Sequence, residues 1–380
     1  MAEQSKAEAP FVSDASLGHT LPAGKEFIGE SDYISLEEMT RQTRKSGKKL
    51  VINIGDSSTS GWDSDVVGLN RERLLKGLPL LSAFFRYRTY ADFLRDRIGH
   101  QFEVINAGVP AHTSLQGKKR LEQLLRHFSS AKFPIEYVTV YYGNNDCVWE
   151  MNRGDSDWIE GGFLRRIHIW IRRMRANRSL FTRTTPKEYQ QNMEDIANIC
   201  LKVGAVPIFL QPVVPLYWKP GTRVVGETLP RKTGYGSREA YRLLDEALRL
   251  WNIGLSHKHL KERLRLLEEA KEKDFVVPRI KNGYSGLLSE MTSSRGLPYV
   301  SIENTLDRRS DDKRYFKDYC HPCGEANSAL AEEIAKVIGA VERSPWEKTR
   351  MIVSAKNPMN NWKKIRGAPS AIPTDNYTLY

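Results

Sequence analysis

The sequence predicts an α/β fold in which a parallel sheet is covered by helices on both faces. Five short apolar runs, rich in β-branched residues, indicate buried strands at residues 49–55, 102–108, 137–143, 205–212 and 297–303. Helical patterns separate them, at residues 87–98, 115–128, 186–203 and 324–341. Strands that alternate with helices are typical of a parallel sheet. We therefore predict a flavodoxin-like three-layer α/β/α sandwich with a roughly five-stranded parallel sheet and helical insertions.

The helix predicted at residues 186–203 carries signals at both ends. Pro186 suits the first turn, where its missing N–H group is not needed, and Gly204 suits the position after the last turn. In a doubly wound sheet the ligand site lies at the carboxyl ends of the strands. Polar residues that follow the predicted strands are therefore the candidates for a functional site.

The predicted strands and helices belong to one domain at residues 48–343. Residues 1–47 are polar, mixed in charge and weakly periodic, which predicts an extended leader. Residues 344–380 are rich in Pro, Asn and Lys, which predicts a C-terminal tail. Three insertions interrupt the alternation, at residues 63–85, 147–185 and 217–296, and the last contains a charged helical stretch at residues 238–273. Insertions after strands commonly shape substrate pockets.

The chain has 380 residues and a formal net charge of +12. Its basic residues are spread along the whole sequence, which is typical of a solvated surface. The alternative is a transient attraction to an anionic surface, such as an acidic polysaccharide or lipid headgroups. No finger, stacking motif or helix-turn-helix signal indicates nucleic-acid binding. The composition says nothing about the oligomeric state.

No segment is apolar over the ~20 residues that a membrane-spanning helix needs. The best candidate, residues 199–216, is interrupted by Lys202, Gln211 and three prolines. The N-terminus lacks the apolar core of a signal peptide. These features predict a cytoplasmic protein, with an exported protein that has been trimmed as the alternative.

Three of the predicted strands end in short polar motifs. The first ends in Gly-Asp-Ser, which places Ser57 in a turn. The second ends in Asn-Ala-Gly, where Gly108 lets a ligand oxygen approach a backbone N–H group. The third ends in Gly-Asn-Asn-Asp, where Asn145 offers a side-chain amide. Each motif by itself is more typical of an ordinary turn or helix N-cap.

A fourth motif, Asp-Tyr-Cys-His, lies in a loop just before the last predicted helix. Asp318 and His321 are three residues apart in it. This spacing lets a carboxylate hold one imidazole nitrogen while the other nitrogen faces a nucleophile. His321 is therefore a stronger candidate for chemistry than the other seven histidines of the chain.

The four motifs, in this order, resemble the four sequence blocks of the SGNH (GDSL-like) hydrolases, a family of serine esterases and acyltransferases. Those blocks are Gly-Asp-Ser, Asn-Ala-Gly, Gly-x-Asn-Asp and Asp-x-x-His. The resemblance covers residues 49–341, with the insertions unmatched. A single block has little specificity, whereas four blocks in register are fairly strong evidence.

The resemblance implies a role for each matched residue. Ser57 is expected to be the nucleophile, His321 the general base and then the general acid, and Asp318 the group that orients the imidazole. The oxyanion hole is expected from the backbone N–H groups of Ser57 and Gly108 and the side-chain amide of Asn145. A serine hydroxyl needs such a base, because it is a poor nucleophile on its own. No metal and no cofactor are expected.

Residues next to these motifs leave other interpretations open. Asp56 and Asp146 are expected to be structural, with hydrogen bonds to the backbone. Ser58 adjoins Ser57 and is a competing candidate for the nucleophile.

The two cysteines beside His321 also allow other chemistry. Cys320 and Cys323, together with Asp318 and His321, are compatible with a metal cluster, although no second closely spaced cysteine pair completes a zinc site. A redox pair is the second alternative, but the thioredoxin-type context is absent. We favour inert, buried thiols.

Residues 162–180 combine apolar residues at helical spacing with several arginines away from that face. We favour a helix that packs on the domain and exposes a basic face. The alternative is a lid that contacts an anionic surface or an acyl chain.

The sequence therefore predicts a serine hydrolase that cleaves an ester through an acyl-serine intermediate. A carbohydrate O-acetyl ester or another short-chain acyl ester is the expected substrate. An O-acyltransferase that modifies a glycan is one alternative, because transfer differs from hydrolysis only in the acceptor of the acyl group. A non-catalytic protein that binds an anionic polymer is the other.

Overall fold

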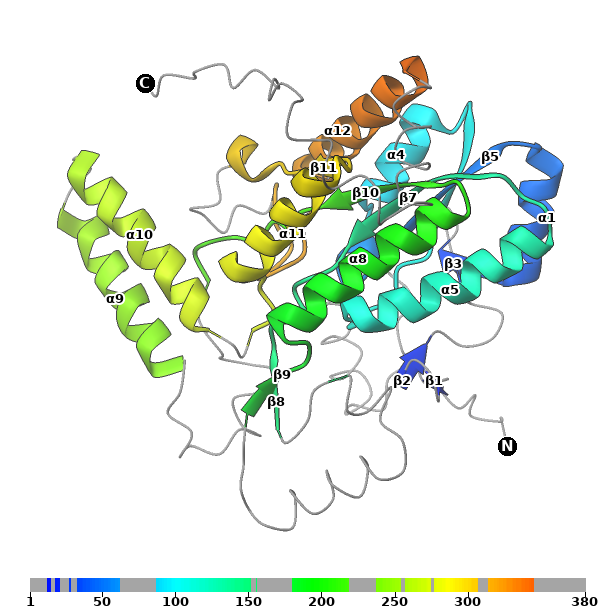
Figure 1. Cartoon of the computed structure of the whole chain (residues 1–380). Helices are drawn as coiled ribbons and strands as arrows, with labels where there is room; N and C mark the ends of the chain where they lie inside the picture. The colour runs from blue at the N-terminus through cyan, green and yellow to red at the C-terminus, as the bar shows by residue number, and fades with distance from the viewer. Residues whose placement is uncertain are drawn as a thin grey trace, which may run out of the picture.

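A seven-stranded sheet lies at the centre of the structure (Figure 1). The computed structural model describes residues 12–14, 18–20, 27–28, 33–61, 87–151, 155, 180–218, 237–253, 257–274, 277–306 and 314–344. The strands of the sheet are β3 (Phe27–Ile28), β4 (Tyr33–Ile34), β5 (Lys49–Gly55), β6 (Phe102–Asn106), β7 (Ile135–Tyr141), β10 (Val206–Leu210) and β11 (Tyr299–Val300). Their spatial order is β11-β10-β7-β5-β6-β3-β4.

The strands from β11 to β6 pair in parallel. Numbered along the chain, their order is the 2-1-3-4-5 of a flavodoxin-like sheet. Strands β5, β7 and β10 are buried along almost their whole length, which explains why each is a continuous apolar run in the sequence. The predicted fold class is confirmed, and β3 and β4 extend the sheet by antiparallel pairing at the β6 edge.

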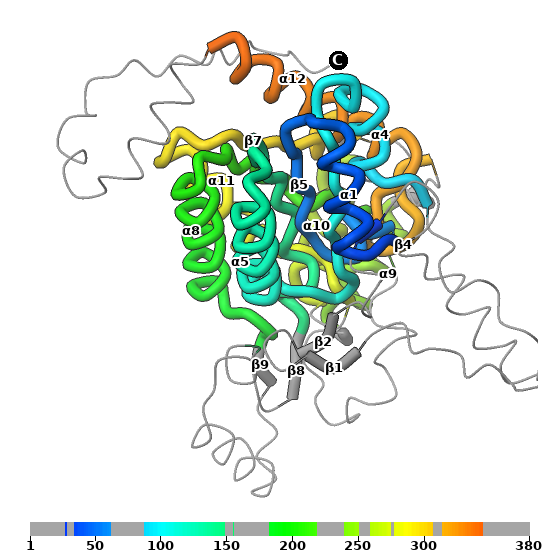
Figure 2. Tube along the Cα trace, turned by 90° about the vertical axis from the view of Figure 1, so that its right-hand side faces the viewer, coloured from blue at the N-terminus to red at the C-terminus, as the bar shows by residue number. Residues whose placement is uncertain are grey.

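Helices cover both faces of this sheet (Figures 1 and 2). The helices that the structure describes are α1 (Leu36–Ser46), α2 (Ser57–Ser60), α4 (Tyr90–Ile98), α5 (Ser114–Ser130), α8 (Pro186–Lys202), α9 (Ser237–Ile253), α10 (His257–Lys273), α11 (Asn282–Arg295) and α12 (Gly324–Arg343), with a 3₁₀ turn at Glu303–Thr305. One apolar core joins the sheet to α1, α5, α8 and α11, and a second joins it to α4 and α12. Ile52 and Ile54 of β5 face the first core and Val51 faces the second, as the alternation of a strand requires.

Helix α8 has the two ends that the sequence predicts. It begins at Pro186, and the Glu188 carboxylate accepts the backbone N–H of Thr185 at 2.8 Å. The Thr185 hydroxyl in turn accepts the backbone N–H of Glu188 at 3.3 Å, so two backbone donors at the helix start are satisfied. Gly204 follows the last turn with a φ of 86°, a conformation that favours glycine.

The segment for which we expected an extended leader, residues 1–47, contains a helix. Ser35 caps α1, the first turn carries two glutamates, and Gly47 ends the helix in the left-handed conformation. Only Met39 and Thr43 of α1 are buried, so the apolar pattern is too weak to predict the helix. Strands β3 and β4 also come from this segment and join the sheet.

The insertion predicted at residues 217–296 contains two parts, a helical arm and a helix that packs on the central sheet. Helices α9 and α10 lie side by side at the left of Figure 1. They enclose a separate apolar cluster of Leu216, Leu243, Leu244, Ala247, Leu266, Leu267 and Ala270. Helix α11 instead packs on the sheet beside α8, through Tyr284, Leu288 and Met291. The insertion is therefore shorter than we predicted.

Two small strand pairs lie outside the central sheet. They are β1 (Val12–Asp14) with β2 (Gly18–Thr20), and β8 (Trp149–Met151) with β9 (Leu180–Thr182). Residues 63–85, residues 162–179 of the basic segment and residues 345–380 of the tail lie outside the described residues. Among the helices that are described, none has the length and apolar character needed to cross a membrane.

Candidate active site

His321 connects Ser57 and Asp318 by an unbroken chain of hydrogen bonds. Nε2 of His321 lies 2.6 Å from Oγ of Ser57, and Nδ1 lies 2.7 Å from Oδ2 of Asp318. The other Asp318 oxygen accepts the backbone N–H groups of Cys320 at 3.0 Å and His321 at 3.1 Å. Because the carboxylate has no proton to give, Nδ1 donates to it, and Nε2 keeps its lone pair for the serine proton.

Ser57 is the first residue of α2, immediately after β5. Asp56 caps this short helix, and its carboxylate accepts the backbone N–H of Ser58 at 2.8 Å. The turn after β6 packs directly on α2, since a Cβ at Gly108 would lie 2.6 Å from the backbone nitrogen of Ser60. A side chain at residue 108 would therefore push the two motifs apart.

The structure separates the two neighbouring serines. Ser57 is partly exposed, and its hydroxyl faces the imidazole. Ser58 is fully buried, and its hydroxyl donates to the backbone carbonyl of Cys320 at 3.4 Å. Of the two serines, Ser57 is the one whose hydroxyl lies within hydrogen-bonding distance of the imidazole.

Two of the predicted oxyanion donors are backbone N–H groups beside Ser57. The Gly108 N–H donates to the side-chain carbonyl of Asn106 at 3.1 Å. Within the described part of the chain, the Ser57 N–H donates no hydrogen bond. Asn106 also donates to the backbone carbonyl of Thr59 at 2.7 Å, so it ties the turn after β6 to α2. Asn106 is the first residue of the Asn-Ala-Gly motif, so the sequence contained a signal for it, although we expected a role only for Gly108.

The third predicted donor, the amide of Asn145, lies against the same turn. It donates to Oδ2 of Asp56 at 3.3 Å and to the backbone carbonyl of His112 at 3.2 Å. Both bonds are long for an N–H donor. The structure thus brings the ends of β5, β6 and β7 together around Ser57, as the sequence predicts for the carboxyl edge of a parallel sheet.

Both aspartates that we expected to be structural make the predicted backbone bonds. Asp56 accepts from Ser58, and Asp146 accepts from the backbone N–H of Ser114 at 3.0 Å and from its hydroxyl at 2.5 Å. Burial raises the pKa of each carboxyl to about 6, against the opposing effect of these hydrogen bonds. The His321 charge also favours ionised Asp56.

Residues 51–334 match the GDSL-like lipase/acylhydrolase family. The chain belongs to this family. It is therefore a serine ester hydrolase with the α/β/α fold, and a catalytic triad and an oxyanion hole are typical of this family. No curated protein matches the sequence.

Solved structures similar to this GDSL-like hydrolase include three bacterial enzymes. The lipase/acylhydrolase of Enterococcus faecalis is 14% identical with a TM-score of 0.35, and the match covers 76% of this chain and 95% of that chain. A psychrotrophic esterase of Pseudoalteromonas, inhibited by monoethylphosphonate, is 12% identical with a TM-score of 0.36, covering 78% and 100%. A GDSL-like lipase of Bacteroides thetaiotaomicron is 12% identical with a TM-score of 0.36, covering 80% and 98%.

The four cysteines of the hydrolase form no disulfide bond, and three of them are buried. Burial raises the pKa of Cys320 well above its ordinary value and that of Cys147 to about 11, so both are protonated and unreactive at neutral pH. Asp318, Cys320 and His321 have potential metal-ligand atoms within 4.8 Å of one another. The imidazole nitrogens and the Asp318 oxygens already make the hydrogen bonds given above, so a metal here would have to break the chain to Ser57.

Aromatic rings surround the imidazole of the hydrolase. The ring centroid of Tyr319 lies 6.2 Å from that of His321, and the ring of Tyr87 lies 6.4 Å from it. Trp218 meets Tyr319 edge to face at 5.7 Å, and both rings are partly exposed. We predicted no role for these residues: Tyr319 lies inside the fourth motif but at an unmatched position, and aromatic side chains outside a motif, such as Tyr87 and Trp218, are usually core.

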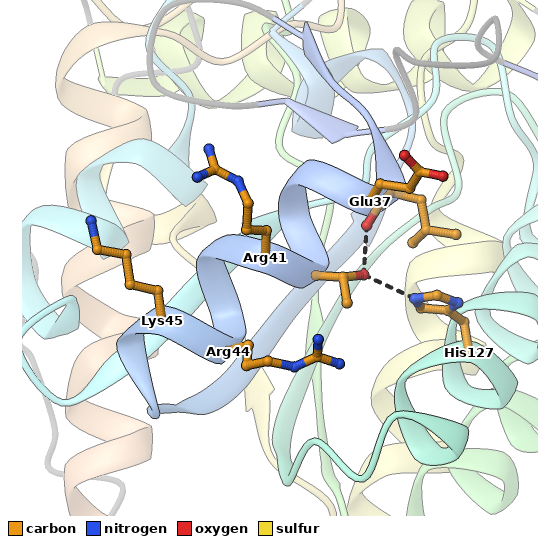
Figure 3. Close-up of a pocket in the computed structure, with 7 residues that line it drawn as sticks. Glu37, Arg41, Arg44, Lys45 and His127 are labelled. Carbon is orange, nitrogen blue, oxygen red and sulfur yellow. Dashed lines mark hydrogen bonds between the residues drawn. The ribbon is translucent and has the colours of Figure 1, made fainter.

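A groove of about 660 Å³ lies elsewhere on the hydrolase, on α1 and the end of α5 (Figure 3). It is lined by Leu36, Glu37, Thr40, Arg41, Arg44, Lys45 and His127, none of which belongs to the predicted site. Thr40 joins its two sides by a 3.0 Å contact with His127. Arg44 and Lys45 lie in the last turn of α1, where positive charge stabilises a helix end. Their placement therefore needs no ligand to explain it.

Proposed function

We propose that the protein cleaves a carbohydrate O-acetyl ester, or another short-chain acyl ester, through an acyl-serine intermediate on Ser57. One observation carries the proposal: Nε2 of His321 lies 2.6 Å from Oγ of Ser57 while Nδ1 lies 2.7 Å from the Asp318 carboxylate. These are the distances at which one imidazole accepts the serine proton and a buried carboxylate stabilises the resulting cation.

In the first half of the reaction, Oγ of Ser57 attacks the ester carbonyl carbon as its proton passes to Nε2 of His321. The carbonyl oxygen becomes an oxyanion, and the imidazolium is paired with Asp318. Collapse of the tetrahedral intermediate breaks the bond to the alcohol oxygen, which takes the proton from Nε2. In the second half, water attacks the acyl-serine, His321 again accepts and returns the proton, and the acid leaves.

The proposed oxyanion hole combines the N–H groups of Ser57 and Gly108 with the amide of Asn145. The Gly108 N–H donates to a neutral side-chain carbonyl at 3.1 Å, and the Asn145 amide donates to the neutral carbonyl of His112 at 3.2 Å and to the Asp56 carboxylate at 3.3 Å. A developing oxyanion is a stronger acceptor than a neutral carbonyl, because charge-assisted hydrogen bonds are roughly twice as strong. The oxyanion therefore takes over the N–H bonds that these carbonyls accept, and each donor is worth ~3 to 4 kcal/mol of transition-state stabilisation.

The aromatic pair beside the imidazole supports a sugar as the alcohol part. Trp218 and Tyr319 are partly exposed and meet at 64°. A ring with an apolar face and a polar edge suits a pyranose, which presents C–H bonds on its faces and hydroxyls around its rim. The net charge of +12 further favours a glycan that carries negative charge.

Steady-state hydrolysis of p-nitrophenyl acetate, p-nitrophenyl butyrate and acetylated glycans tests the proposal, with release of p-nitrophenol as the readout for the first two and release of acetate for the glycans. The wild type is expected to turn over the acetyl esters, Ser57→Ala is expected to lose turnover, and Ser58→Ala is the matched control. Equal rates for the wild type and Ser57→Ala would overturn the proposed nucleophile. Acyl transfer to an added glycan in preference to water would identify a transferase.

A further inference from the structure

Four charged side chains are buried where α10 ends and α11 begins. They are Lys271, Asp274, Arg279 and Lys281, each at most 4% exposed. Arg279 donates from Nη2 to Oδ2 of Asp274 at 3.0 Å. The ammonium of Lys281 donates to the backbone carbonyl of Lys271 at 2.6 Å and to that of Asp274. We call residues 277–281 the connector, and these contacts attach it to the last turn of α10 and to Asp274.

Net stability is a poor explanation for such a cluster. Removing charges from water costs several kcal/mol per ion, and well-packed apolar residues often do as well. Two nitrogens of Arg279, Nε and Nη1, are moreover buried without a partner among the described residues. The cluster therefore suggests a requirement for geometry at this connector.

The connector holds the loop that carries Asn145. The backbone N–H of Ile280 donates to the side-chain carbonyl of Asn144 at 3.0 Å, and the thiol of Cys147 donates to the backbone carbonyl of Arg279 at 3.0 Å. Ile280 also packs on Gly143, where a Cβ would lie 2.5 Å from Cδ1 of Ile280. Residues on both sides of Asn145 are thus fixed by two consecutive residues of the connector.

We propose that the Asp274–Arg279 ion pair positions the side-chain amide of Asn145 in the oxyanion hole, acting through Ile280 and Asn144. The inference rests on the proposed role of Asn145 in the reaction. An oxyanion donor must be held within ~0.5 Å of its productive place. The amide's own bonds, at 3.2 and 3.3 Å, are too long to fix it, so its place depends on the backbone of the loop.

The competing role for the ion pair is to attach the arm of α9 and α10 to the domain. That arm has its own apolar cluster and its own exposed ion pairs, such as Arg265 with Glu262 at 2.7 Å. Arg265→Gln changes a charged pair of the same arm without touching the connector, which makes it the matched control. Arg279→Gln removes the buried pair, and Arg279→Lys keeps the charge.

A double-mutant cycle with Asn145→Ala separates the two roles. Arg279→Gln is expected to lower kcat for p-nitrophenyl acetate by ~10- to 100-fold, as for a slightly misplaced catalytic group, with KM within ~2-fold. Arg279→Lys is expected to recover part of the loss, and Arg265→Gln to keep the wild-type kcat. In the Asn145→Ala background, Arg279→Gln is expected to change kcat by less than ~2-fold, because a residue that acts through Asn145 has nothing left to position.

An equal loss of kcat in both backgrounds, or an unchanged kcat in a folded Arg279→Gln protein, would overturn the inference. Thermal unfolding reports whether each variant is folded. If Arg279→Gln does not fold, Asn144→Ala replaces it in the same cycle, since it removes the bond to Ile280 and leaves the ion pair in place. Wild-type activity in Asn145→Ala would remove the role of Asn145 and this inference together, whereas the proposed function would fail only if Ser57→Ala also remained active.

Discussion

Replacing Asp318 by asparagine tests the tautomer on which the proposed mechanism depends. Asp318 is 7% exposed, and its two oxygens have separate tasks: one accepts from Nδ1 of His321 at 2.7 Å, and the other accepts two backbone N–H groups. Asparagine can keep its oxygen on the backbone donors and then points its NH₂ group at Nδ1. The imidazole must accept that bond, so its own proton moves to Nε2, which faces Ser57.

An imidazole with its proton on Nε2 cannot accept the serine proton. In the well-studied serine protease triad this exchange lowers kcat by about 10⁴-fold, which corresponds to ~5 kcal/mol in the activation free energy. We expect a loss of similar size in Asp318→Asn, measured as kcat for p-nitrophenyl acetate at pH 7.5. The midpoint of thermal unfolding is expected to change little, because the backbone bonds survive. A folded Asp318→Asn protein within about threefold of the wild-type kcat would refute the reasoning, since no step would then depend on the tautomer.

Three further predictions concern the buried carboxyl of Asp56, the proposed sugar contact of Trp218 and the thiol of Cys320. Burial raises the pKa of Asp56 to about 6, so the folded wild type binds this proton more tightly than the unfolded chain and loses stability as pH rises from about 4 to about 6. Asp56→Asn has no such titration. The free energy of unfolding of Asp56→Asn in urea, relative to that of the wild type, is therefore expected to increase by up to ~3 kcal/mol as the pH rises over that range. A difference that does not change with pH would contradict this. Trp218→Ala is expected to raise KM for acetylated glycans by about tenfold and to leave KM for p-nitrophenyl acetate unchanged. An equal change of KM for both substrates would refute the role of Trp218 in binding the sugar. Cys320→Ala, with or without EDTA, is expected to keep kcat within about threefold of wild type, and a larger loss would favour the metal or redox alternative.

The sequence was sufficient for the central sheet because the strands that form it are buried on both faces. Their apolar runs, such as 49–55 and 137–143, predict β5 and β7, and the rule that ligands bind at carboxyl strand ends predicts that Ser57, Gly108 and Asn145 meet. Strands β3 and β4 were missed because each has two residues and no apolar run extends beyond them, whereas the equally short β11 lies within the apolar run at 297–303. Helix α1 was missed because it buries only Met39 and Thr43. Apolar sequence patterns do not predict elements that bury so few side chains.

Parts of the site that depend on contacts between distant residues also could not be predicted from the sequence. Trp218 and Tyr319 are a hundred residues apart, and no local spacing indicates that their rings meet. Arg279 follows the charged stretch of residues 238–273, and its residue type favours a solvated position, yet its side chain is 1% exposed and paired with Asp274. A buried charge is identified only by its surroundings, because the residue type by itself favours exposure.

Labelling with a fluorophosphonate probe, followed by peptide mass spectrometry, tests most directly that Ser57 is activated by His321. We expect one adduct per chain, carried by Ser57 and absent from Ser57→Ala and His321→Ala, with Ser58→Ala labelled at the wild-type rate. An adduct on Ser58, or undiminished labelling of His321→Ala, would contradict the activation of Ser57 by His321.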